Sequence, residues 1–211
     1  MKFSILQDTQ THQEKLKAIT DEIKIIFFEP EKSCHQCPHI KLLLTELEEA
    51  SDKVILELVN EIQQPDLIKK FGIERCPAMA FIGAKDYGIR YYGTPTNFVE
   101  CFLDLVSDIS KGGHPLKSDV LKEIEKLKKP VNIKVLGTQT CPYTPIAGRT
   151  AVRFAISSEL ITVHLIDVIS FPEFQTRYNL RSTPEIVIND QTILYGIKSE
   201  EDLLKEIIRF E

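Results

Sequence analysis

Two cysteine-to-proline intervals of equal length divide the sequence into matching halves. Cys34 precedes Pro77 by 43 residues, and Cys141 precedes Pro184 by the same 43 residues. Each interval also holds, at the same place, an aromatic residue, a Gly or Asn, and an aliphatic residue: Phe71-Gly72-Ile73 and Tyr178-Asn179-Leu180. A repeat of about a hundred residues indicates a duplicated domain, since solenoid repeats span roughly 20–50 residues. The sequence therefore indicates two copies of one domain in the chain.

In each half an opening helix is expected to precede a short apolar strand, which runs into a polar loop and then the cysteine. The expected strands are 23–28 and 131–136, and a second pair follows at 54–59 and 161–166. Apolar residues at helical spacing follow each cysteine. Pro65 and Pro172 then open further helices, because proline suits a first helical turn.

The residues Gly72 and Asn179 are predicted to end those helices, since Gly and Asn most easily adopt the left-handed conformation of a helix C-cap. A hairpin closing near Gly93 or Gly196 and a last amphipathic helix complete each half. The order predicts an α/β fold with a mixed sheet in each half and helices on both faces. Two glycines and a proline in 111–115 favour a boundary that gives domains 1–113 and 114–211.

The composition is that of a folded, non-membrane chain. The hydrophobic share is 43% and the charged share 27%, and no apolar run approaches the roughly 18 residues of a membrane helix. The N-terminus turns polar too soon for a signal peptide, which makes a cytoplasmic location the expectation. The formal net charge of −5 argues against nucleic acid as the main partner.

The spacing of Cys34 and Cys37 admits two chemistries. Among five cysteines they form the one Cys-x-x-Cys, a spacing typical of redox or metal sites in a reducing compartment. A zinc site would need further ligands, for which Cys76 with His35 or His39 are the candidates. On the motif alone, redox and metal chemistry stand about equal.

The surrounding pattern resembles the thioredoxin–glutaredoxin superfamily, in which a Cys-x-x-Cys starts a helix and a proline opens a hairpin strand. The tandem arrangement resembles the protein disulfide oxidoreductases of thermophilic archaea and bacteria, over essentially the whole chain. The stretches that carry this resemblance are 86–93, Cys141-Pro142-Tyr143, 153–156, Tyr178-Asn179 and 184–188. It implies two tandem thioredoxin-like folds and thiol–disulfide oxidoreductase activity without a cofactor or metal.

The resemblance also implies roles for individual residues. Cys34 is the expected nucleophile and Cys37 the resolving thiol. Pro77 is expected to be cis and to present the backbone of Cys76 to an extended substrate, although the superfamily usually has a small or β-branched residue at position 76. Whether Cys76 is passive, a disulfide partner or a metal ligand stays open.

The second half departs from the family pattern. A glutaredoxin-like site would read Cys-Pro-Tyr-Cys, but Thr144 takes the place of its second cysteine, which excludes a second dithiol. Cys141 is therefore either an activated single thiol, forming a secondary site with Thr183 and Pro184, or a remnant in a unit kept as scaffold.

The chemistry expected at the first site is that of a thiolate. An ordinary cysteine has a pKa of about 8.5, and a helix N-terminus, protonated His35 and the thiol of Cys37 would all favour the thiolate of Cys34. Glu29 and Glu31 precede the site in the sequence. Either could relay a proton to Cys37 or be a solvated carboxylate. Cys101 falls in an apolar helical pattern and is expected in the core.

The sequence thus predicts dithiol–disulfide exchange on protein substrates. The electron donor would be a thioredoxin-reductase-like enzyme or glutathione. One alternative is a metal-binding or redox-sensing module that uses Cys34, Cys37 and Cys76. Another is an electron-transfer domain serving a single partner, such as a peroxidase.

Overall fold

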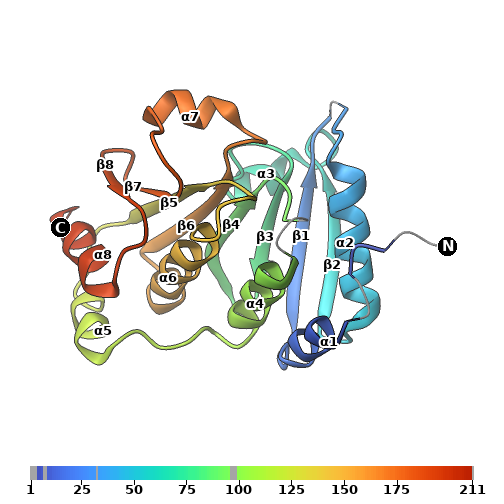
Figure 1. The fold of residues 1–211 in the computed structure, drawn as a ribbon, viewed down its shortest axis with the longest axis horizontal. Coiled ribbons are helices and arrows are strands. Elements are labelled where there is room, and N and C mark those ends of the chain that lie inside the picture. The colour runs from blue at the N-terminus through green and yellow to red at the C-terminus, as the bar shows by residue number, and fades with distance from the viewer. Residues whose placement is uncertain (1–3, 7–8, 32, 96–98, 211) are drawn as a thin grey trace. The chain divides into compact units, whose positions relative to one another are not determined.

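A computed structural model describes residues 4–6, 9–31, 33–95 and 99–210. The chain divides into two compact units, one formed by Met1–Asp86 and Arg90–Gly112 and the other by Tyr87–Ile89 and Gly113–Glu211. Each unit contains helix, strand, helix, strand, helix, hairpin and helix in that order, as the sequence predicts (Figure 1). None of the helices in the described ranges is both long and apolar enough to cross a membrane.

Within the described residues, four helices and four strands belong to the first unit, except that Tyr87–Ile89 of the last strand group with the second unit. They are α1 (Gln10–Lys17), β1 (Ile23–Glu29), α2 (Cys37–Ala50), β2 (Val54–Asn60), α3 (Pro65–Lys70), β3 (Ala78–Ile82), β4 (Asp86–Tyr92) and α4 (Val99–Ser110). The second unit contains α5 (Ser118–Ile124), β5 (Val131–Gly137), α6 (Thr144–Ser157), β6 (Ile161–Asp167), α7 (Pro172–Tyr178), β7 (Glu185–Ile188), β8 (Thr192–Tyr195), α8 (Glu200–Ile207) and a 3₁₀ turn (Ile208–Phe210).

Strand pairing follows one scheme in both units. In the first, β1 is parallel to β2 and antiparallel to β3, which pairs in turn with β4. In the second, β5 is parallel to β6 and antiparallel to β7, which pairs with β8. The central strands β1 and β5 are almost wholly buried, because β-branched and aromatic side chains fill both of their faces. Each unit is a thioredoxin-like mixed sheet, which confirms the predicted fold class.

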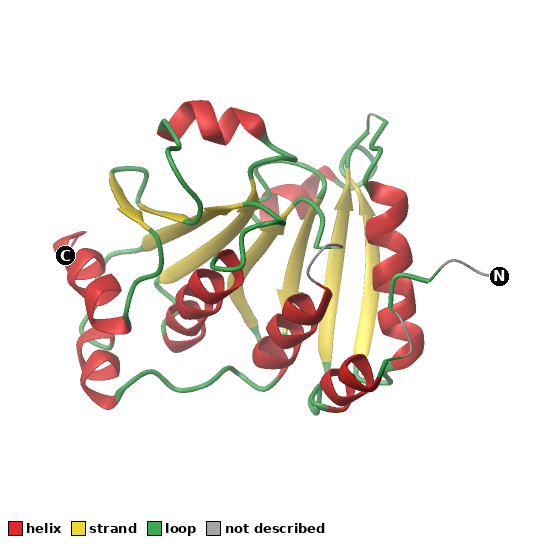
Figure 2. Ribbon diagram, in the orientation of Figure 1, coloured by secondary structure: helices red, strands yellow, loops and turns green. Residues whose placement is uncertain are grey.

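Helices cover the sheet of the first unit on both faces. Figure 1 shows α4 in front of its strands and α3 behind them, and Figure 2 shows the same layers by element type. The face of α4 that contacts the sheet is apolar and includes Leu103, Val106 and Ile109, each with no exposed surface. Burial of such side chains contributes about 1.5–3 kcal/mol each before entropy is counted.

Matching turns end α3 and α7, where the sequence placed left-handed residues. Gly72 has φ +61° and Asn179 has φ +50°. Beyond each, the backbone N–H of Ile73 or Leu180 donates to a carbonyl five residues back, at 3.0 Å and 2.9 Å. These are Schellman caps, which satisfy carbonyls that the helix end leaves free, and they confirm both predictions.

Candidate functional site

Cys34 and Cys37 form a disulfide with an S–S distance of 2.09 Å. Cys34 lies in the loop after β1 and is half-exposed, whereas Cys37 is the first residue of α2 and only 5% exposed. The two sulfurs therefore differ in access, and an external sulfur can approach Cys34 far more readily than Cys37.

The first turn of α2 presents groups that can stabilise a negatively charged sulfur. Pro38 lies in its first turn, where the missing N–H costs no helical bond. The N-cap residue Gln36 supplies no side-chain cap, and the backbone N–H of Cys37 instead points at Cys34 Sγ, 3.1 Å away. This N–H and the positive end of the helix dipole both favour negative charge on Cys34 once the disulfide is reduced.

The proline that begins each hairpin follows a cis peptide bond, at Cys76–Pro77 and at Thr183–Pro184. This confirms the geometry that the resemblance implied for Pro77. Because Phe28 of β1 pairs with Ala78 of β3, Pro77 lies level with Glu29 at the carboxyl end of β1. The loop to Cys34 leaves the sheet at the same edge.

Cys76 is a half-buried thiol outside the disulfide. Burial raises its pKa to about 12, and the adjacent Glu61 carboxylate adds to the rise. The described ranges contain no group of three or more His, Cys, Asp or Glu side chains placed to hold a metal ion. The metal alternative through Cys34, Cys37 and Cys76 therefore gains no support from the structure.

Two expectations about neighbouring residues were wrong. Glu29 is not a solvated carboxylate, because it is half-buried and pairs with Lys41 Nζ at 2.7 Å. Cys101 is not in the core: it lies on the partly exposed side of α4, since the helix turns Phe102 and Leu103 inward in its place. Glu31 is exposed, as expected of a loop carboxylate.

Cys141 occupies the place of Cys34 in the second unit, three residues before α6 begins at Thr144. It is a free, half-exposed thiol whose Sγ donates to the Thr183 carbonyl at 3.2 Å. Burial works to raise its pKa, but the hydroxyls of Thr144 and Thr183 and the backbone N–H groups of Tyr143 and Thr144 outweigh it, so the pKa is lowered. Such an environment favours a reactive thiolate.

Thr144 stands where Cys37 stands in the first unit. Its buried Oγ1 lies near enough to Cys141 to favour the thiolate there, but it completes no hydrogen bond while Cys141 is a thiol. Its side chain packs over Gly137, the last residue of β5, so closely that a Cβ at Gly137 would overlap Thr144 Cγ2. The matching end of β1 carries the larger Glu29. The start of α6 therefore packs directly against the end of β5, and Gly137 has no room for a side chain.

Glu185 is a site residue for which the sequence offered no signal. It has no exposed surface, and its Oε1 accepts the backbone N–H groups of Arg181 and Ser182 at 2.7 Å and 3.2 Å. Its Oε2 is buried without a partner. The carboxylate shapes the turn that delivers Thr183 to Cys141, which a local pattern does not reveal.

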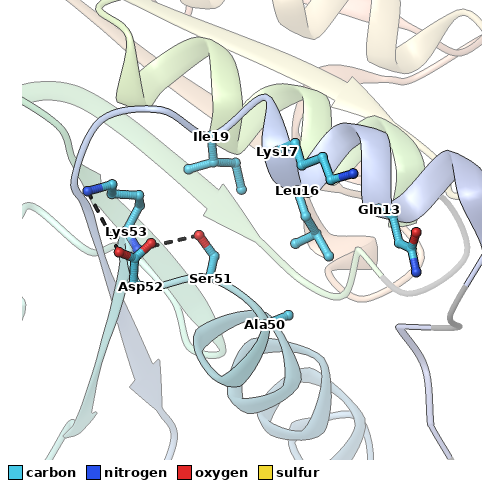
Figure 3. Close-up of a pocket in the computed structure, with 8 residues that line it drawn as sticks. All are labelled: Gln13, Leu16, Lys17, Ile19, Ala50, Ser51, Asp52 and Lys53. Atoms are coloured by element: carbon cyan, nitrogen blue, oxygen red, sulfur yellow. Dashed lines mark hydrogen bonds and ion pairs between the residues drawn. The ribbon is translucent and has the colours of Figure 1, made fainter.

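A hollow of about 420 Å³ lies at the far end of the first unit, between α1 and the turn from α2 to β2. Figure 3 shows Leu16 and Ile19 from the α1 segment facing Ala50, Ser51, Asp52 and Lys53. Because Ile23 N–H bonds to Lys53 O, this is the amino end of β1. Cys34 follows its carboxyl end, so the hollow does not serve the disulfide.

Comparison with known proteins identifies the fold. Residues 131–209 match a thioredoxin domain family. A protein disulfide oxidoreductase from Aeropyrum pernix superposes with a TM-score of 0.86 at 23% identity, covering 96% of this chain and 92% of that one. The N-terminal domain of alkylhydroperoxide reductase AhpF from Enterococcus faecalis superposes with a TM-score of 0.85 at 21% identity, covering 95% and 100%. No curated protein sequence matches significantly. The structural likeness establishes two tandem thioredoxin-like folds.

Proposed function

We propose that this chain is a thiol–disulfide oxidoreductase that acts on protein disulfides through Cys34 and Cys37. The observation that carries the proposal is the disulfide itself, with a half-exposed sulfur before a helix and a buried sulfur inside its first turn. This asymmetry separates an attacking from a resolving thiol. The likeness to a protein disulfide oxidoreductase supports the same assignment.

The exchange balances without a cofactor. In the reduced protein, the Cys34 thiolate attacks one sulfur of a substrate disulfide, forming a mixed disulfide and releasing the other sulfur as a thiolate. Cys37, after losing its proton, attacks Cys34 Sγ and releases the second substrate thiol. Two electrons have passed to the substrate, and the Cys34–Cys37 bond is the oxidised product. The reverse sequence oxidises a dithiol.

The direction depends on the reduction potential of the pair against its donor. We propose a cytoplasmic setting in which a thioredoxin-reductase-like enzyme or glutathione returns the pair to the dithiol. Backbone groups of Cys76 and Pro77 would bind the substrate as an extended strand beside the disulfide.

Insulin reduction tests the assignment. Wild type and Cys141→Ser should reduce insulin at similar rates, whereas Cys34→Ser should be inactive. Cys37→Ser should accumulate mixed disulfides that a mass measurement detects, because no resolving thiol remains. Loss of activity in Cys141→Ser alone would move the reactive centre to the second unit.

A second candidate is electron transfer to one dedicated partner. The neighbour from Enterococcus faecalis is a domain of an alkylhydroperoxide reductase, and this fold could serve a peroxidase in the same way. The insulin assay separates the two, since rapid reduction of insulin speaks for a broad substrate range.

A further inference from the structure

The second unit places its one cysteine where a helix start and a cis-proline segment meet. Cys141 is half-exposed, and its Sγ donates to the carbonyl of Thr183, the residue before cis Pro184, at 3.2 Å. The backbone N–H of Thr144, the first residue of α6, donates to the Cys141 carbonyl at 3.2 Å. Residues 114–211 contain no further cysteine. The sulfur therefore lies in a site that belongs wholly to the second unit.

The loop that carries Cys141 is anchored to the end of β6. The Gln139 side chain donates to Asp167 Oδ2 at 2.8 Å, and Asp167 is only 4% exposed. Next to it, the backbone N–H of Val168 donates to the carbonyl of Gly137 at 2.9 Å. The residues that follow β6 therefore lie beside the loop of the cysteine.

A buried hydroxyl at the start of α6 has no hydrogen-bond partner among the described residues. It is Thr144 Oγ1, on a side chain that packs over Gly137. A buried polar group without a partner destabilises a protein. The Cys141 thiol gives its proton to the Thr183 carbonyl and is only a weak acceptor, whereas a thiolate at the same sulfur would accept the Thr144 O–H. The hydroxyl therefore indicates an ionised sulfur as the state that the site stabilises.

The electrostatics around the sulfur agree with this geometry. Burial works to raise the pKa of Cys141, but the surrounding hydroxyl and backbone N–H donors outweigh burial and lower the pKa. The thiolate is the form of cysteine that attacks a disulfide. Because Thr144 replaces the second cysteine of the motif, a disulfide formed at Cys141 has no resolving thiol within its own unit.

Exposed apolar side chains border this thiol. Tyr143 and Ile146, at the start of α6, are 56% and 49% exposed. Ile169, which follows the residue bonded to the end of β5, is 64% exposed. Burying such side chains against a ligand is favourable because apolar surface leaves water.

The corresponding positions of the first unit are more polar. Counted from the cysteine of each unit, these three places are held there by Gln36, His39 and Ile62. The second unit therefore suits a polypeptide with apolar residues beside its cysteine. Glutathione, which has two carboxylates and no apolar side chain, would leave this surface uncovered.

We propose that Cys141 is a second reactive centre, which captures the disulfide of an apolar polypeptide segment as a lasting mixed disulfide. The Cys141 thiolate attacks one sulfur of the polypeptide disulfide, and the other sulfur leaves as a thiolate. One S–S bond forms as another breaks, so no oxidant or reductant is consumed. The adduct persists until an external thiol attacks it. This activity is additional to the proposed function, because it uses neither Cys34 nor Cys37.

The test uses the full chain with Cys34→Ser and Cys37→Ser, so that the first site takes no part. The probe is the symmetrical disulfide of a short peptide that has Leu and Phe beside its single cysteine, at pH 7.5. Mass spectrometry of the protein and its digest should find one peptide adduct per chain, on Cys141, which remains after free peptide is removed. The same peptide with Ser beside its cysteine, and glutathione disulfide, should each react about tenfold more slowly, because less apolar surface is buried.

Three substitutions at position 144 separate the hydroxyl from the missing thiol. Thr144→Val keeps Cγ2 and removes the hydroxyl, so capture should slow at pH 7.5 and the midpoint of its pH profile should move upward. Thr144→Ser keeps the hydroxyl and should retain the original midpoint. Thr144→Cys supplies a resolving thiol, which attacks Cys141 Sγ and expels the peptide thiolate, so the adduct should be lost.

A matched pair of exposed isoleucines tests the apolar surface. Ile169→Ser should reduce the preference for the apolar peptide. Ile62→Ser makes the same change at the matching place of the first unit and should leave the preference unchanged.

Three results would overturn the proposal: adducts on Cys76 or Cys101 with none on Cys141, equal rates for the three disulfides, or an unchanged pH midpoint in Thr144→Val. The first two are measured without substitution in the second unit, so they stand even if a variant at position 144 fails to fold. Failure of the proposed function would appear separately, as a lack of insulin reduction by the wild-type protein.

Discussion

At the scale of single residues, the two units show how neighbouring groups set the reactivity of a cysteine. Burial and the Glu61 carboxylate raise the pKa of Cys76, whereas the hydroxyl and backbone N–H groups around Cys141 outweigh its burial and lower its pKa. We expect iodoacetamide to alkylate Cys141 faster than a cysteine peptide at pH 7.5, because its thiolate fraction is larger. A rate at or below that of the peptide, measured by mass spectrometry after digestion, would contradict the assigned environment.

A substitution at Thr144 tests whether the second unit retains the backbone geometry of a dithiol site. Thr144→Cys places a thiol at the start of α6, in the position that Cys37 holds at the start of α2. We expect it to form a disulfide with Cys141 under mild oxidation, seen as a mass loss of two hydrogens within the tryptic peptides. Ile146→Cys, two residues further along the same helix and exposed, is the control and should stay reduced. Equal oxidation of the two would mean that the frame is lost.

At the scale of elements, the ends of α3 and α7 depend on one left-handed residue each. Asn179→Ala should lower the free energy of unfolding by about 1 kcal/mol, since a Cβ-bearing residue without a side-chain polar group pays for φ +50°. Asn179→Gly should cost nothing or stabilise slightly, because glycine adopts this region freely. Urea denaturation measures both, and an equal loss in the two variants would assign the effect to the Asn side chain instead.

The close contact between the start of α6 and the end of β5 is a second feature at the scale of elements. Gly137→Ala should destabilise the protein by roughly 1–3 kcal/mol, because the new methyl group overlaps Thr144 Cγ2. Thr144→Ala removes Cγ2 and Oγ1 and leaves Cβ 2.9 Å from the added atom, so the combined variant should recover part of the loss. Urea midpoints of the four proteins form a double-mutant cycle. Additive costs would show that the two positions do not touch.

At the scale of the whole molecule, the sequence predicts the structural elements that recur in both halves, but it does not predict the side-chain contacts that depend on tertiary packing. The strands, the prolines that open α3 and α7, the two left-handed caps and the position of Cys37 at a helix start all follow from local pattern and spacing. The contact of Glu61 with the Glu31 N–H joins residues 30 apart, that of Thr144 with Gly137 joins residues 7 apart, and that of the buried Glu185 with the turn at 181–182 joins residues 3 and 4 apart. Such contacts depend on tertiary packing, as does the face of α4 that leaves Cys101 half-exposed.

A tandem fold with one dithiol predicts a single redox transition for the whole chain. The oxidised protein retains three cysteines outside the disulfide, Cys76, Cys101 and Cys141, and full reduction should raise the titratable thiols to five, the number in the sequence. Against a glutathione or dithiothreitol couple, the transition should fit one two-electron curve, with about 30 mV for each tenfold change in the ratio. Thr144→Cys should add a second transition of equal amplitude. Fewer than three thiols in the oxidised protein, counted after unfolding so that the half-buried Cys76 also reacts, would show that a further cysteine joins the exchange, and the site would then use more than one pair.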